Sequence, residues 1–155
     1  GPSLDAPKEA EITYVGSLAV CFAVLVTWVS GAGALEVKDK AKAPPGWWEA
    51  SGPMAIPPQY FDQILSAYGL TLVDVSKAPA TYARKVDDKV AWEMAPRTYT
   101  PEETDQILSA YAVKLTDVGK CPPTYARVVD GKPVFESGPI AWGPREIDRI
   151  LAAYQ

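Results

Sequence analysis

Apolar residues form one long run near the start of the chain and then fall into a spaced pattern. Residues 12–35 are uncharged and largely apolar, and Glu11 and Glu36 bound the run. As a helix rising about 1.5 Å per residue, it is long enough to cross a hydrocarbon core about 30 Å thick. We therefore expect a single transmembrane helix over 12–35, preceded by an N-terminal tail over 1–11.

A cleaved secretory signal is the alternative interpretation of this run. The small residues from Gly31 to Ala34 resemble a signal peptidase site. The residues ahead of the run are net acidic, however, with Asp5, Glu9 and Glu11 against Lys8. A signal peptide begins with a basic region, so the acidic start favours a span that is retained.

Small residues lie along one face of the predicted span. They recur at three- and four-residue steps, while bulky residues form a stripe elsewhere around the helix. Helices in lipid commonly associate through such smooth faces, so we expect this one to contact other membrane-protein subunits. Trp28 is expected near a membrane interface or a partner. The small face consists of Gly16, Ala19, Ala23, Thr27 and Gly31.

The distribution of lysines predicts the orientation of the chain. Lys38, Lys40 and Lys42 follow the span, whereas only Lys8 precedes it. Positive residues favour the inner side of a membrane, and an unpaired Cys121 agrees with a reducing compartment. We expect a single-pass protein of a bacterial inner, thylakoid or mitochondrial inner membrane, with its C-terminal domain on the cytoplasmic, stromal or matrix side.

Beyond the span, the pattern of apolar and polar positions repeats every 43 residues. The stretch Asp62 to Tyr68 returns unchanged at Asp105 to Tyr111 and with changes at Asp148 to Tyr154. Self-similarity at a fixed period indicates a supersecondary unit copied in tandem, in which each copy covers an apolar face of its neighbour. The period predicts a Pro/Lys linker (36–46), a first unit (47–95), a second unit (96–138) and a truncated third unit (139–155).

Each unit is predicted to contain a short helix followed by a β-hairpin. Apolar residues at helical spacing follow Pro58, Pro101 and Pro144, and proline is favoured at the first position of a helix. Two short strand-like segments come next, separated by tight turns at 87–88 and 130–131. The predicted fold is a single N-terminal transmembrane α-helix plus a small α+β domain of tandem helix–β-hairpin repeats. The last helix is expected to cap the open end.

Two adjacent tryptophans precede the first helix. Trp48 stands ahead of a proline much as Trp92 and Phe135 do in the later copies, so we expect it in the core. Trp47 has no counterpart at that position. We therefore expect Trp47 to contact the membrane or a partner.

Composition excludes several kinds of chemistry. The chain has a net charge of −4 and no clustered basic residues, which argues against binding nucleic acid. It contains no histidine, and this removes His-based acid–base catalysis, His-activated nucleophiles and His-ligated metals or pigments. Cys21 and Cys121 predict neither a zinc site nor a disulfide. We expect no cofactor and no metal.

Some polar residues recur with the repeat and therefore require a functional test. A catalytic site rarely needs two identical copies of each participant, whereas a structural hydrogen bond in a duplicated unit is copied automatically. We therefore expect structural roles and no catalytic residue, with Arg84 or Arg127 able to pair with one of the helix aspartates. The recurring residues are Asp62, Asp105 and Asp148, Asp74 and Asp117, Tyr82 and Tyr125, and Arg84 and Arg127.

These features predict a non-catalytic accessory subunit of a larger integral-membrane complex. Its span would pack on partner helices in the lipid bilayer, and its repeat domain would dock on the same complex. Photosynthetic reaction centres, photosystems and respiratory complexes are rich in such small subunits. The alternative is a membrane-tethered module that recognises a peptide or glycan through exposed aromatic residues. An enzyme is the least supported class, because no acid–base pair is evident.

Overall fold

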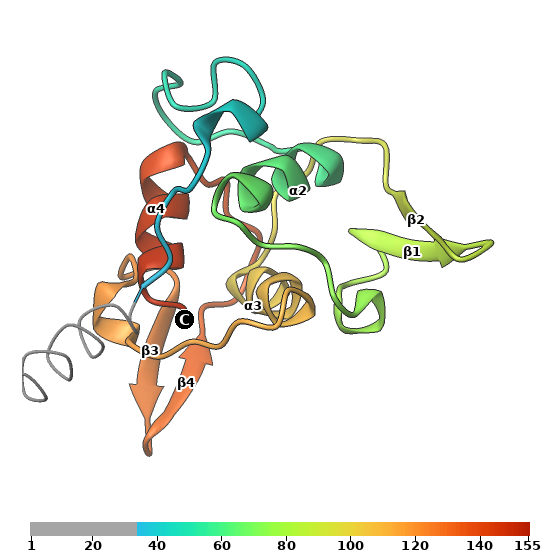
Figure 1. The fold of residues 1–155 in the computed structure, drawn as a ribbon. Coiled ribbons are helices and arrows are strands. Elements are labelled where there is room, and N and C mark those ends of the chain that lie inside the picture. The colour runs from blue at the N-terminus through green and yellow to red at the C-terminus, as the bar shows by residue number, and fades with distance from the viewer. Residues whose placement is uncertain (1–33) are drawn as a thin grey trace, which may run out of the picture. The chain divides into compact units, whose positions relative to one another are not determined.

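Three α-helices and two β-hairpins make up the part of the chain that the structure, a computed structural model, describes, residues 34–155 (Figure 1). The hairpins project from the body, while the helices gather in it. The predicted repeat of helix and hairpin is confirmed. The elements are α2 (Pro58–Ala67), β1 (Ala83–Val86), β2 (Lys89–Trp92), α3 (Pro101–Ala110), β3 (Ala126–Val129), β4 (Lys132–Phe135) and α4 (Pro144–Ala152).

The predicted transmembrane helix falls almost wholly outside the described residues, which include only its last two positions, Ala34 and Leu35. Within residues 34–155, no helix has the length and apolar character needed to cross a membrane. The predicted span therefore stays a prediction. So do the contacts expected of Gly16, Ala19, Ala23, Thr27, Gly31 and Trp28.

Local sequence explains where these elements begin and turn. All three α-helices carry proline in the first turn, and α3 has the predicted capping box between Thr100 and Glu103. Both hairpins turn through two residues with positive φ, as type I′ turns require. These residues are Asp87 and Asp88 in one hairpin and Asp130 and Gly131 in the other.

Each helix is joined to a segment that lies ahead of it in the chain. Three 3₁₀ turns, η1 (Lys40–Lys42), η2 (Val75–Lys77) and η3 (Val118–Lys120), are each capped by an aspartate side chain. The amide of that aspartate and the amide before it both donate to one carbonyl at the end of a helix. The pairs are Lys38 and Asp39 to Ala67, Val73 and Asp74 to Ala110, and Thr116 and Asp117 to Ala153.

These bonds define three blocks, which we call the first (34–69), second (70–112) and third (113–155) block. Each block contains an Asp-capped 3₁₀ turn and the helix that follows it, and the second and third blocks carry a hairpin between the two. The expected linker at 36–46 differs from this arrangement, because its residues form the start of the first block. Their amides bond to the end of α2, and Ala43 is buried.

The blocks close into a ring by one kind of backbone contact. Each block presents two bridging positions. Each of them lies 43 residues before the equivalent position of the next block. The bridges join the first block to the second, the second to the third, and the third back to the first. They are Ile56 to Arg97, Tyr99 to Ile140, and Met54 to Trp142. The chain therefore has a pseudo-threefold arrangement, and α4 is one of three equivalent helices rather than the cap of an open array.

The same cycle appears in the side chains. A tyrosine at the end of each helix donates its hydroxyl proton to an aspartate on the helix of another block. Tyr111 bonds to Asp62, Tyr154 to Asp105, and Tyr68 to Asp148. Apolar residues of all three helices fill the space inside the ring, each no more than 1% exposed. They are Ile64, Leu65, Ile107, Leu108, Ile150 and Leu151.

Candidate functional site

The recurring tyrosines and aspartates form buried hydrogen-bond chains between blocks. The hydroxyl of Tyr82 lies 2.9 Å from that of Tyr111, and Tyr125 lies 2.7 Å from Tyr154. Because Tyr111 and Tyr154 donate to aspartates, Tyr82 and Tyr125 must donate to them. These chains satisfy polar groups that would otherwise be buried without partners. Their place at the contacts between blocks is a structural role.

Burial shifts the pKa of every group in these chains upward. Desolvation raises the pKa of Asp62 and of Asp105, and the hydrogen bond from tyrosine opposes this shift only in part. Desolvation also raises the pKa of Tyr111 and Tyr154 far above the ordinary value of 10.0. The tyrosines therefore stay protonated donors at physiological pH.

The arginines of the hairpins have partners other than those expected. Arg84 pairs with Glu93 at 3.4 Å and Arg127 pairs with Glu136 at 2.9 Å, and both pairs lie near the surface. The expectation that they pair with a helix aspartate is wrong, because tyrosines occupy the aspartates. Exposed pairs of this kind contribute about 0–1 kcal/mol each.

Cys121 is buried beside η3 and is a free thiol. Burial raises the pKa of its thiol to about 11, so the thiolate form is scarce at neutral pH. Within residues 34–155, no group of three or more acidic or cysteine side chains is arranged to hold a metal ion. The polar residues that recur with the repeat thus have structural partners, and the differences between the blocks become the features of interest.

Trp47 marks the largest difference. The expectation that it lacks a counterpart is wrong, because it follows η1 as Tyr82 follows η2 and Tyr125 follows η3. It belongs to the core and is only 5% exposed. Sequence alignment at 43 residues missed this match, since the first block lacks a hairpin and Asp39 lies 35 residues before Asp74.

The counterparts of Trp47 are each surrounded by aromatic rings. Tyr82 makes edge contacts with Phe61, Trp92 and Tyr99, at centroid distances of 6.0, 5.3 and 6.2 Å. Tyr125 likewise contacts the rings of Phe135, Trp142 and Tyr154. Trp47 forms no such ring pair within residues 34–155. The reason is that the first block has no hairpin aromatic and has Ile56 where the others have Tyr99 and Trp142.

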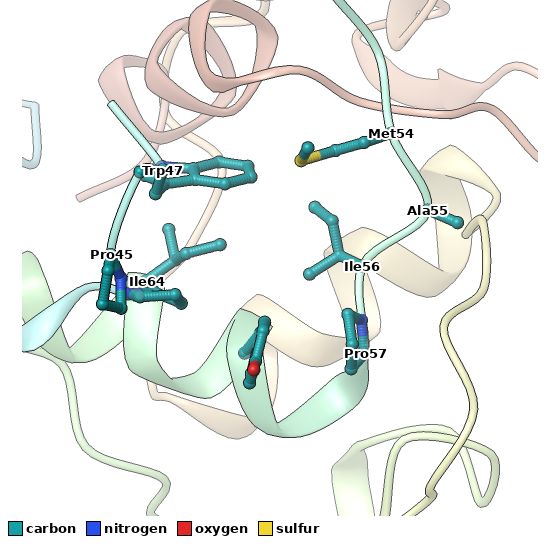
Figure 2. Close-up of a pocket in the computed structure, with 10 residues that line it drawn as sticks. Pro45, Trp47, Met54, Ala55, Ile56, Pro57 and Ile64 are labelled. Atoms are coloured by element: carbon teal, nitrogen blue, oxygen red, sulfur yellow. The ribbon is translucent and has the colours of Figure 1, made fainter. Parts of the chain in front are cut away.

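An apolar pocket of about 230 Å³ lies beside Trp47. Figure 2 shows Trp47 and Ile64 on one side of it and Met54 and Ile56 on the other. Pro44, Pro45, Pro57 and Tyr60 complete most of the wall. Met54 is 38% exposed and Tyr60 49% exposed, so the pocket opens to the surface.

One residue of the pocket wall carries a buried polar group that lacks a partner. The indole Nε1 of Trp47 is buried and has no hydrogen-bond acceptor within residues 34–155. At the equivalent positions, the hydroxyls of Tyr82 and Tyr125 are each paired with another tyrosine. A buried donor without a partner costs about 1–3 kcal/mol, so an acceptor brought to it would be favoured.

The exposed ring of Tyr60 also lines a second hollow, of about 350 Å³, between α2 and the end of β2. The other walls include Trp92 and Met94, and Met94 is 92% exposed. Tyr60 thus links the pocket to this hollow, whose lining is both apolar and polar, with Gln59 and Glu93 beside Trp92 and Met94. Sequence analysis missed Met54, Ile56 and Tyr60. Comparing the three copies position by position would have indicated them, since Glu103 and Glu146 stand where the first block has Tyr60.

Comparison with known protein families, with curated proteins and with solved structures finds no match to this chain. The assignment of function therefore depends on the residues and geometry described above.

Proposed function

We propose that this protein is a non-catalytic accessory subunit of a larger membrane complex. In this proposal, the predicted span at 12–35 packs against partner helices, and the ring of three blocks docks on an extramembrane surface of the same complex. A bioenergetic assembly is the proposed setting, as expected from the abundance of small single-span subunits in such complexes.

One observation carries the proposal. The tyrosines and aspartates of the helices are engaged in hydrogen bonds that join the blocks, whereas the first block presents an apolar pocket that adjoins a hollow with the exposed side chains of Tyr60 and Met94. Exposed aromatic and methionine side chains such as Tyr60 and Met94 are typical of a site that binds another protein.

The test is to isolate the full chain from gently solubilised membranes and to identify proteins that co-elute at fixed stoichiometry. We expect a large complex, and its pigments or haems would name the process. Elution as a free chain or as a simple homodimer would contradict the proposal.

Matched substitutions in the predicted span sharpen this test. Replacing Ala23 with leucine adds bulk to the small-residue face, whereas the same change at Val24 adds it elsewhere on the helix. We expect Ala23→Leu to weaken retention in the complex far more than Val24→Leu. Equal effects would remove the small face from the argument.

A membrane-tethered binding module is the second candidate. The groove between Tyr60 and Trp92 favours it, because this alternative requires exposed aromatic residues on the domain. The same isolation experiment separates the two candidates. A tethered module would elute alone and would bind its peptide or glycan in a separate step.

A further inference from the structure

We propose that the pocket of the first block binds an aromatic side chain of a partner polypeptide, which takes the place that rings of this chain fill in the other two blocks. This inference rests on the proposed docking function and names the chemistry of the group that docks. The second and third blocks serve as the reference, because each packs a ring of this chain at the position equivalent to the pocket.

The first block lacks a ring that the other two blocks have. Tyr99 and Trp142 each pack a ring against the tyrosine at the position equivalent to Trp47, at 6.2 and 5.8 Å between centroids. Ile56 stands at this position in the first block and carries no ring. The pocket lies between Ile56 and Trp47, and its volume of about 230 Å³ accommodates a phenol or an indole.

The indole of Trp47 is a buried donor without an acceptor in the part of the chain that the structure describes. Trp47 is 5% exposed. The Nε1 of Trp142 in the third block donates to the hydroxyl of Thr104 at 3.3 Å. Nε1 is shielded from solvent, so an occupant that brings a carbonyl oxygen along with a ring would pair this donor once the indole turns toward the pocket. A polypeptide meets the requirement, because every aromatic residue is flanked by backbone carbonyls.

The wall of the pocket carries no charged side chain. No lining residue of the pocket is ionisable except the phenol of Tyr60, whereas Glu103 and Glu146 stand at the position of Tyr60 in the other blocks. Edge-to-face contact between Tyr60 or Trp47 and an incoming ring is favourable by geometry. The site therefore selects an uncharged ring over a charged or purely polar side chain.

The direct experiment uses the full chain, labelled with ¹⁵N at tryptophan and placed in lipid nanodiscs. The probe is N-acetyl-tryptophanamide, which combines an indole with two carbonyl groups. We expect a saturable shift of the Trp47 indole resonance, assigned with a Trp47→Phe variant. The Trp142 indole, which already has an acceptor, should not move. No shift at Trp47, or equal shifts of every indole, would overturn the inference.

A second probe separates an aromatic side chain from a lipid tail or another apolar group. N-acetyl-leucinamide carries the same carbonyls without a ring. We expect it to bind at least tenfold more weakly, a difference of about 1.4 kcal/mol. Equal binding of the two probes, or a Trp47 shift that follows the lipid composition alone, would contradict the assignment of an aromatic occupant.

Two variants test the pocket from within. Ile56→Tyr supplies the ring found in the second block. In this variant the probe should no longer shift the Trp47 indole resonance, and the melting temperature should stay the same or rise. Tyr60→Glu removes one wall of the pocket at an exposed position and leaves the core unchanged. It should weaken binding of the probe at least tenfold. Unchanged binding by both folded variants would refute the inference.

Isolation of the Ile56→Tyr protein separates this inference from the proposed function. If the wild-type chain elutes with partners and Ile56→Tyr loses one, both proposals are supported. If Ile56→Tyr keeps every partner, the function stands and the inference fails. If the wild-type chain elutes alone although the probe binds, the function fails and the pocket assignment stands.

Discussion

The first block and its two copies differ in the kind of surface that the same architecture produces. The second and third blocks each extend a hairpin and surround a buried tyrosine with rings. The first block has no hairpin, replaces the tyrosine with Trp47 and leaves an open pocket. The helices and the bonds that close the ring are nevertheless equivalent in all three. Architecture and surface can thus vary independently, because the bridges at Met54 and Ile56 are made by the backbone, whereas the side chains of these residues line the pocket.

The largest expected effect comes from deleting the last helix, which tests whether the first two blocks fold without the third. Deleting residues 144–155 removes α4, the acceptor Asp148 and the donor Tyr154. We expect the cooperative thermal transition of the domain to disappear, since the first and second blocks each lose a neighbour. Circular dichroism and calorimetry measure this. A sharp transition at the original temperature would show that the first two blocks fold without ring closure.

The contact between the third and first blocks leaves no room for a side chain at Gly143, whereas the equivalent position of the second block is Thr100. A methyl group on Gly143 would lie 2.8 Å from the carbonyl oxygen of Gly52. Gly143→Ala should therefore cost about 1–3 kcal/mol of unfolding free energy. It should also speed hydrogen exchange at the amide of Met54, which bonds to the carbonyl of Trp142.

Thr100→Ala is the matched change at the equivalent position of the second block. It removes the cap on α3 and should cost about 1 kcal/mol. Exchange at Met54 should stay unchanged in this variant. The comparison fails if both variants open the same amides.

A smaller effect distinguishes the ends of α2 and α3. Gly69 and Ala112 stand at equivalent positions, with φ values of 80° and 62°. An alanine at positive φ is strained, so Ala112→Gly should raise stability by about 1 kcal/mol. Gly69→Ala should lower it by a similar amount. Urea unfolding measures both, and two changes of the same sign would contradict this account.

The smallest expected effect is a dependence on pH. Burial raises the pKa of Asp62 and Asp105 above the ordinary value of 3.8, so both carboxyls hold their protons more tightly in the folded state. The free energy of unfolding should therefore decrease as pH rises from 3.8 through the raised pKa values. Replacing both residues with asparagine keeps an acceptor for each tyrosine and should flatten this decrease.

Urea titrations between about pH 4 and about pH 7 measure the decrease. Asp148→Asn serves as the control, because Asp148 is the more exposed residue and the partial burial that raises its pKa is opposed by the nearby charge of Lys40. We expect this variant to change the slope of unfolding free energy against pH by less than the double variant does. Parallel curves for wild type and the double variant would contradict the prediction.

Much of the local structure was predictable from sequence. The proline at each helix start, the box of Thr100 and Glu103, and the turn at Asp130-Gly131 depend on neighbouring residues, and all three were found. Ring closure was not predictable in this way. A period shows that copies contact each other, but the angle between successive copies decides whether they form an array or a ring, and that angle comes from packing between distant residues.

The candidate pocket was hidden for a related reason. The period breaks in the first block, where the hairpin is missing, so the lysine-rich stretch at 36–46 resembles a linker. Its Asp39 is the same cap as Asp74 and Asp117. Only the bonds from that stretch to Ala67 show that it belongs to a block, and only then does Trp47 align with Tyr82.

Closure of the ring also bears on how molecules of this protein meet one another. The bond between Tyr68 and Asp148 joins residues 80 positions apart in the chain, whereas the other two equivalent bonds span 49. If this contact opens, the exposed faces of the first and third blocks are complementary head-to-tail surfaces of the kind that build rings or filaments from separate chains. Domain-swapped dimers, with six blocks in a larger ring, are therefore the expected product of partial unfolding at high protein concentration.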